Sequence, residues 1–226
     1  MIEEHSKLTG VWGSYGPGFG DLWASLGYAS RLGEHSGRPC LVSRWVGING
    51  GDTDCGERFH EMLNLLDVPP DSVRIVDEHY TLCFGGSCWG TAVRPCLVKQ
   101  AARPTRSVSY QLDGRSSAHI KNAPASESVQ LFNWADSAQV SMVRVGLPLS
   151  VKECADVIAQ STAFVGVCSG MSMLALSVGV PVFILEYDLK IDWWYGQNRF
   201  IKCPGISSLL LPRNDHGPTL PDLFKL

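Results

Sequence analysis

The stretch FVGVCSGMSMLALSVGVPVFIL, residues 164–185, carries no charged side chain and is long enough to cross a lipid bilayer as a single helix. Small residues and a proline interrupt it at Ser169, Gly170, Gly179 and Pro181. We therefore interpret it as a buried strand, a turn, a helix that ends before Gly179 and a second buried strand, and we expect no membrane span. Strands that are apolar throughout are typical of a parallel sheet that is covered on both faces.

Segments on both sides of this stretch continue the alternation of strands and helices, which implies an α/β fold with parallel sheets. Residues 101–105 resemble a linker because Pro104 breaks any helix, and they divide the chain into two small Rossmann-like halves, 1–103 and 104–226. The expected strands are 8–12, 39–43, 73–76, 107–112, 140–145, 163–167 and 180–185, and the expected helices outside the opening stretch are 22–32, 54–66, 127–138 and 150–160.

The composition excludes several classes of protein. A chain of 226 residues with 45% apolar residues and a net charge of −3 is globular and is not a strong non-specific nucleic-acid binder. None of the eight cysteines forms a C-x-x-C pair, so we expect reduced thiols in preference to a disulfide framework. The acidic N-terminus lacks the apolar core of a signal peptide, and we therefore expect a cytoplasmic protein.

A glycine-rich run, residues 13–21, follows the first expected strand and ends in Asp21. An amphipathic pattern from Leu22 to Leu32 then predicts a helix. Loops beyond the carboxyl ends of strands face the ligand crevice of an open α/β sheet. Asp21 is therefore a candidate general base, and the alternative is a helix cap.

A second turn of this kind, Cys168-Ser169-Gly170-Met171-Ser172, joins the buried strand to the helix of the opening stretch. Backbone N–H groups at a helix N-terminus bind anions, and Gly170 allows a phosphate to approach closely. The hydroxyls of Ser169 and Ser172 are candidate additional donors. The alternative is a capped turn that binds no ligand.

The run from Val143 to Leu185 resembles the C-terminal half of GT-B glycosyltransferases, especially the bacterial heptosyltransferase group. In the N-terminal half, Gly18-Phe19-Gly20-Asp21 is similar to the Gly-x-Gly-Asp turn of that family. The resemblance implies that the turn at residues 169–172 holds the diphosphate of a nucleotide sugar and that Asp21 is the catalytic base. The matching pieces of the C-terminal half are Val143-Arg144-Val145-Gly146, residues 150–160, Cys168-Ser169-Gly170-Met171-Ser172-Met173 and Gly179-Val180-Pro181-Val182.

The chain also departs from that family. The family has an acid before Ser-Gly and a histidine after it, whereas this chain has Cys168 and Met173, and it is shorter than a typical GT-B enzyme. These differences leave open a non-catalytic protein that binds a nucleotide or nucleotide sugar. An oxidoreductase is a further alternative, although Gly16-x-Gly18-x-x-Asp21 lacks the third glycine of a dinucleotide-binding fingerprint.

Several other residues follow expected strands or loops of the crevice. Glu186 and Lys190 come after strand 180–185 and are expected at the donor site, where Lys190 would neutralise charge on the leaving group. Trp194 and Arg199, with Gly18 and Gly20, are candidates for the acceptor side, although an aromatic cluster also forms a lid on a core. Asp52-Thr53-Asp54 imitates a metal-binding motif, but we prefer a polar loop with a helix cap and expect neither metal nor cofactor.

The sequence therefore predicts a compact GT-B-like enzyme in which residues 1–103 receive the acceptor and residues 104–226 bind the nucleotide sugar. The expected reaction is metal-independent, inverting transfer of a hexosyl or heptosyl group to an acceptor hydroxyl. The resemblance puts a saccharide acceptor ahead of a modified base in DNA, which would need a basic track. The candidates for such a track are Arg94, Lys99, Arg103, Arg106, Arg115 and Lys121.

Overall fold

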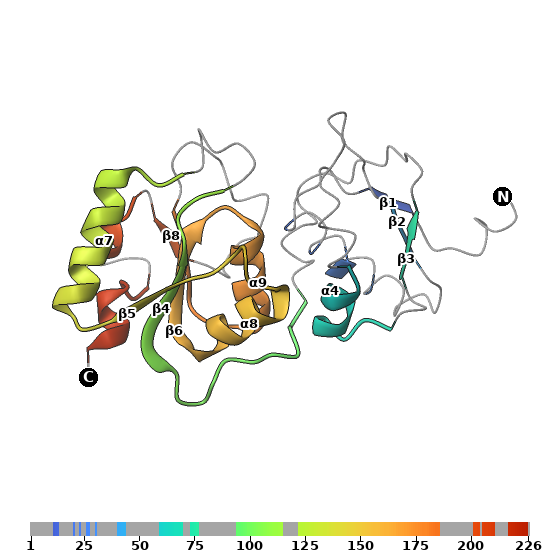
Figure 1. The fold of residues 1–226 in the computed structure, drawn as a ribbon, viewed down its shortest axis with the longest axis horizontal. Helices are drawn as coiled ribbons and strands as arrows, with labels where there is room; N and C mark the ends of the chain where they lie inside the picture. Colours follow the sequence, from blue (N-terminus) through green and yellow to red (C-terminus); the bar gives the residue numbers. More distant parts are fainter. Residues whose placement is uncertain are drawn as a thin grey trace, which may run out of the picture. The chain divides into compact units, whose positions relative to one another are not determined.

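The chain divides into two compact units: the first covers Met1–Leu97 with Trp193–Gly196, and the second covers Val98–Asp192 with Gln197–Leu226. Both are α/β, as the alternation of strands and helices predicts (Figure 1). A computed structural model describes residues 11–13, 20, 23, 26–27, 30, 40–43, 59–69, 73–76, 94–114, 122–185, 201–203, 205–210 and 217–225 of the protein.

The first unit contains a parallel three-stranded sheet in the order β1-β2-β3. The strands expected at 8–12, 39–43 and 73–76 are confirmed wherever the structure describes them. The expected helix 54–66 is confirmed in its second half. The elements are β1 (Val11–Gly13), β2 (Cys40–Ser43), α4 (Phe59–Leu65) and β3 (Val73–Val76).

Two helical segments supply the described core of this unit. Trp23, Leu26 and Ser30 are helical and buried, and their spacing puts them on one helix face, as expected for Leu26. Arg94 links this segment to the end of α4: its Nε donates to the Leu66 carbonyl at 2.7 Å and its Nη1 to the Ser30 hydroxyl at 3.2 Å. Since the last carbonyls of a helix have no partner within it, Arg94 acts as a C-terminal cap for α4.

The second unit contains a five-stranded, all-parallel sheet in the order β5-β4-β6-β7-β8. Each element expected between residues 107 and 185 is confirmed, with its ends displaced by at most two residues. The elements are β4 (Thr105–Gln111), α7 (Ala125–Ser137), β5 (Ser141–Arg144), α8 (Val151–Gln160), β6 (Ser161–Val167), α9 (Gly170–Val178), β7 (Val182–Leu185), β8 (Ile201–Cys203), α11 (Ser207–Leu210) and the 3-10 turn η3 (Pro221–Phe224).

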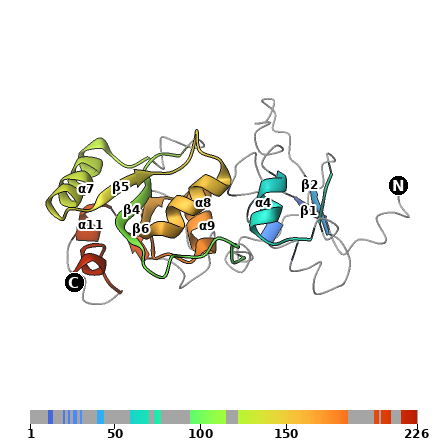
Figure 2. The ribbon, with the colours of Figure 1, turned by 60° about the horizontal axis from the view of Figure 1, so that its bottom comes forward.

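Helices cover this sheet on both faces. Helices α7 and α11 lie on one side and α8 and α9 on the other (Figures 1 and 2). One core cluster joins the sheet to α7 and the C-terminal turn through Val108, Val165, Phe183, Leu131 and Phe224, all buried. The opening stretch is therefore β6, α9 and β7, and within the described residues no helix combines the length and apolarity that a membrane span requires.

The polar side of β4 is buried. Ser107 and Ser109 alternate with Val108 and Tyr110, yet Ser109 is fully buried and Ser107 is 6% exposed. The Ser109 hydroxyl donates to the Ala163 carbonyl of β6 at 3.3 Å, so it is satisfied within the sheet. Small side chains here allow α8 to pack closely on β4, and the alternation in the sequence therefore does not mark a solvent-facing side.

Gly166 in β6 is required by packing. A Cβ at this position would lie 2.6 Å from the Phe164 ring and 2.9 Å from the Gln111 carbonyl oxygen, both closer than real contacts allow. Phe164 is fully buried and cannot turn outward.

We expect Gly166→Ala to lower the free energy of unfolding by about 1–3 kcal/mol, because the added methyl overpacks the centre of the sheet. Urea unfolding would measure this loss. In a Phe164→Leu background the smaller side chain gives the methyl room, so the same substitution should cost less there. An equal cost in both backgrounds would contradict the packing explanation.

Candidate functional site

The strand order of the second unit reverses at β4, which marks one edge of the sheet as the expected place of a ligand crevice. The chain passes from β4 to β5 on one side and then crosses back to β6 on the other side of β4. In open parallel sheets, ligands bind beyond the carboxyl ends of the strands at such a reversal. The strands β4, β5 and β6 end at Gln111, Arg144 and Val167, and the loops that follow them start at this edge.

The turn after β6 is held by the side chain of Ser172. Its Oγ accepts the Ser169 N–H at 3.1 Å, and its single proton is shared between the Ser169 carbonyl at 2.6 Å and the Val167 carbonyl at 3.3 Å. Ser172 is fully buried. In this structure its hydroxyl therefore shapes the turn, and its expected role as a donor to phosphate remains a prediction.

Only part of the expected donor turn reaches solvent. Ser169 and Gly170 are partly exposed, whereas Cys168, Met171 and Met173 are buried. Helix α9 begins at Gly170, as expected, and the N–H groups of a first helical turn have no partner within the helix. The accessible surface of the turn is thus small and made of backbone, one hydroxyl and the positive end of a helix dipole.

The turn after β5 lies on the other side of the end of β4 from the turn after β6. Gly146 has a φ of +112°, a left-handed conformation that favours glycine, and its N–H donates to the Cys154 sulfur at 3.3 Å. Helix α8 then starts with the expected capping box: Glu153 N–H donates to the Ser150 hydroxyl, and Ser150 N–H donates to the Glu153 carboxylate at 2.8 Å. The Ser150 backbone N–H, with its hydroxyl, lowers the pKa of Glu153.

Gln111 joins the two turns, and the sequence analysis missed it. Its Oε1 accepts the Ser169 hydroxyl proton at 2.5 Å, and its Nε2 lies 3.3 Å from where a Cβ on Gly146 would stand. The available signal was position: Gln111 is the last residue of the strand that precedes the reversal. A single glutamine at a strand end forms no motif, so only the sheet order shows what it contacts.

Most of the predicted site residues outside this turn lie beyond the described residues. This holds for Asp21, which we predicted as the base, and for Gly18, Glu186, Lys190, Trp194 and Arg199. Gly20 is helical and half-buried, whereas the sequence predicted a glycine-rich turn there and a helix from Leu22. Asp52 and Asp54 are also outside, and among the residues that the structure describes no group of three potential metal ligands occurs.

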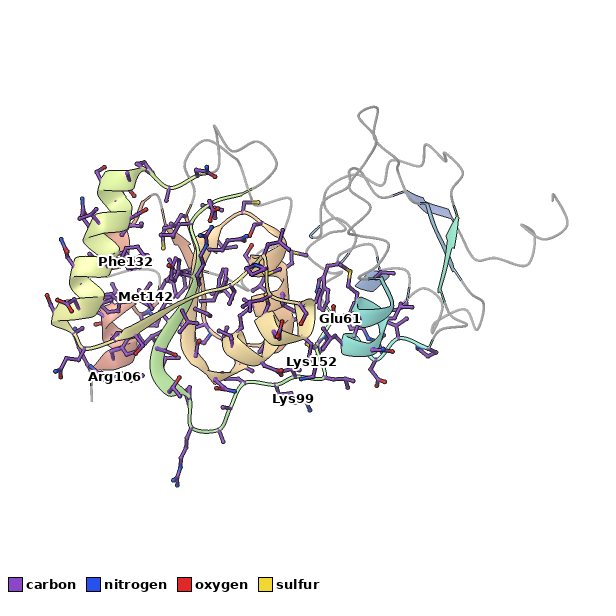
Figure 3. The ribbon with its side chains drawn as sticks, in the orientation of Figure 1. Glu61, Lys99, Arg106, Phe132, Met142 and Lys152 are labelled. Carbon is purple, nitrogen blue, oxygen red and sulfur yellow. The ribbon has the colours of Figure 1, made fainter. Side chains whose placement is uncertain are left out.

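Two arginines of the candidate basic track, Arg94 and Arg106, donate hydrogen bonds to protein carbonyls. Arg106 donates to the carbonyls of Phe224 and Ala138, each at 3.1 Å, and its guanidinium carbon lies 5.5 Å from the centre of the Phe224 ring. In Figure 3, Arg106 lies beside the C-terminal turn and Lys99 below α8, at separate places of the second unit. Arg115 and Lys121 lie outside the described residues.

No protein-family model and no curated protein matches this sequence. Solved structures do match, all at low identity. The iron-containing dodecameric glycosyltransferase TibC from enterotoxigenic E. coli H10407 is 14% identical with a TM-score of 0.53, and TibC in complex with ADP-D-beta-D-heptose is 12% identical with a TM-score of 0.51. Alignments cover 79% and 80% of this chain, but the chain spans only 58% of the length of each TibC chain.

A glycosyl transferase family 9 protein from Veillonella parvula DSM 2008 matches more evenly. It is 8% identical with a TM-score of 0.52, and the alignment covers 86% of both chains. These likenesses show that the chain has a glycosyltransferase-like α/β fold with parallel sheets.

The contacts of Ser172 yield a test of the turn. Ser172→Ala removes a fully buried hydroxyl and leaves the part-buried Ser169 N–H without this acceptor, and we expect it to lower the free energy of unfolding by about 1–3 kcal/mol. Ser137→Ala is a matched control, because that exposed hydroxyl donates to a carbonyl four residues earlier in α7 and its loss should cost less than about 0.5 kcal/mol. Chemical denaturation measures both, and equal losses would refute a special role for Ser172.

Proposed function

We propose that this protein is a glycosyltransferase that moves a hexosyl or heptosyl group from a nucleotide sugar to an acceptor hydroxyl, by a metal-independent, inverting reaction. The observation that carries the proposal is the turn after β6, where the start of α9 lies beside the strand reversal of a glycosyltransferase-like fold. An anion site that is built from backbone N–H groups at the start of a helix suits a diphosphate.

The donor would bind at the second unit. Backbone N–H groups from Gly170 to Ser172 and the Ser169 hydroxyl would hold the diphosphate, and Glu186 and Lys190 would complete the site. TibC, a neighbour with a related fold, is a heptosyltransferase solved with ADP-D-beta-D-heptose, which supports a nucleotide sugar as the donor. The helix dipole and Lys190 would stabilise charge on the departing diphosphate, so no divalent cation is needed.

Chemistry would begin at Asp21. Its carboxylate would take the proton of the acceptor hydroxyl while the acceptor oxygen forms a bond to the anomeric carbon. The bond from that carbon to the phosphate oxygen breaks in the same step, and the configuration inverts. Gly18, Gly20, Trp194 and Arg199 would contribute to the acceptor side.

A saccharide is the acceptor that we favour, ahead of a modified base in DNA. Arg94 and Arg106 use their guanidinium groups on protein carbonyls, which leaves fewer cations for a phosphate backbone. The thiols of Cys96, Cys154, Cys168 and Cys203 are buried and reduced, in keeping with a cytoplasmic enzyme.

A non-catalytic nucleotide-sugar binder is the second candidate, and a specific observation favours it. Cys168 and Met173 occupy the positions where the resembling family has an acid and a histidine, and they are 4% and 1% exposed. Neither side chain can therefore reach a ligand in this structure, and this chain lacks two polar groups at the turn.

One experiment separates the two candidates. The purified protein is heated with a panel of nucleotide sugars to find the one that raises its melting temperature, and release of the nucleoside diphosphate is then measured with candidate saccharides. Stabilisation with turnover supports the enzyme, and stabilisation without hydrolysis or transfer supports the binder. If none of the nucleotide sugars raises the melting temperature, both candidate functions are contradicted.

Asp21→Asn should reduce kcat by about 10²–10⁴-fold, because the amide has nearly the same shape but cannot accept the acceptor's proton. Affinity for the donor and the melting temperature should stay close to those of the wild type. Asp136→Asn, on the exposed face of α7, is a matched control and should keep its full rate. A wild-type rate for Asp21→Asn would show that Asp21 is only a helix cap.

Excess EDTA should leave turnover unchanged, because the proposed phosphate site consists of N–H dipoles and cationic side chains. A coupled assay for released nucleoside diphosphate, run after dialysis against chelator, measures this. Loss of activity that manganese or magnesium restores would instead make Asp52 and Asp54 candidate metal ligands.

A further inference from the structure

Gln111 lies between the turn after β5 and the turn after β6. It ends β4, the strand between β5 and β6, and it pairs in register with Gly166 of β6. Its carboxamide reaches from the turn after β6, where Oε1 accepts the Ser169 hydroxyl proton, to the turn after β5, where Nε2 faces Gly146.

Gly146 leaves room for the carboxamide of Gln111, and Gly166 leaves room for the backbone at the end of β4. A Cβ on Gly146 would lie 3.3 Å from Nε2, and a Cβ on Gly166 would lie 2.9 Å from the Gln111 carbonyl oxygen. Larger residues at either position would displace the strand end or its side chain. The carboxamide is thus accommodated by its surroundings and is not a surface group in random orientation.

The direction of the hydrogen bond matters for a diphosphate. A serine hydroxyl has one proton, and here it is given to Gln111 Oε1, while the Ser172 N–H donates to Ser169 Oγ in the capping box. Ser169 therefore has no proton left to donate to a ligand in this arrangement. Diphosphate oxygens are acceptors and need donors. A half-turn of the carboxamide exchanges Oε1 and Nε2, after which Nε2 donates to Oγ and the hydroxyl proton can turn to the phosphate.

Such a rotation breaks no other hydrogen bond in the described part of the chain, because Nε2 has no hydrogen-bond partner among the residues described there. We propose that Gln111 is the positioning residue of the donor site: when a diphosphate binds, its amide donates to Ser169 Oγ and thereby aims the serine proton at the ligand. This inference rests on the proposed donor function of the turn.

A double-mutant cycle tests the inference. Binding of ADP, GDP, UDP and CDP is measured by titration calorimetry for the wild type, Gln111→Met, Ser169→Ala and the double variant, with melting temperatures to show folding. For the best-bound nucleotide, each single variant should bind about tenfold more weakly, and the double variant no more weakly than Ser169→Ala. Gln160→Met, at the exposed end of α8, should bind as the wild type does.

Gln111→Glu adds the decisive comparison. A carboxylate can still accept the serine proton but has no N–H to donate, so this variant should bind the diphosphate no better than Gln111→Met. Wild-type affinity in Gln111→Glu, or losses that multiply in the double variant, would overturn the positioning role while the donor site stands. If the wild type binds none of the four nucleotides, the proposed donor function itself fails, and the inference fails with it.

Discussion

The position of β4 between β5 and β6 is the constraint on which the described site depends. Because the chain crosses back over β4, the loops after β5 and β6 lie on either side of the end of this strand. Backbone pairing of Gln111 with Gly166, and of Tyr110 with Arg144, holds these strand ends in fixed register. The turn at Ser169 and the turn at Gly146 therefore share one carboxamide, although they are far apart in sequence.

Close packing makes that register hard to change. Because Gly166 has no side chain, the Phe164 ring can pack against the strand at this position. The buried serines of β4 let α8 approach the sheet. On the other face, large side chains such as Phe183 and Leu131 fill the space beneath α7. Interiors packed at this density transmit small shifts, so the geometry of the crevice edge is coupled to residues that never contact a ligand.

The electrostatic character of the described crevice edge is mild. The turn after β6 offers backbone N–H groups and one exposed hydroxyl, and its neighbours Cys168 and Met173 are apolar and buried. The nearest described ion pair, Arg144 with Asp113, joins two well-exposed side chains at 2.9 Å and is screened by solvent. Affinity for an anion at this edge would consequently depend on dipoles and on the orientation of single protons.

Much of the fold could be predicted from the sequence because its signals are local. Apolar strands at 163–167 and 180–185, the capping box at Ser150 and the helix end before Gly179 depend on residues only a few positions apart, and the structure confirms all of them. Resemblance in the same segment pointed to the glycosyltransferase-like fold that the solved neighbours share. The sequence signal that places the Ser169 turn at the end of a strand also depends only on neighbouring residues.

What the sequence by itself determined is therefore the alternation of strands and helices, their limits and the turn that opens α9. The tertiary structure decided which strands are neighbours, and with that it decided what Ser169 and Ser172 contact. Ser172 faces inward and supports the turn, while Gln111 reaches Ser169 from 58 positions away. Hydrogen bonds between such distant residues depend on sheet order and packing, and no local pattern of side chains encodes either.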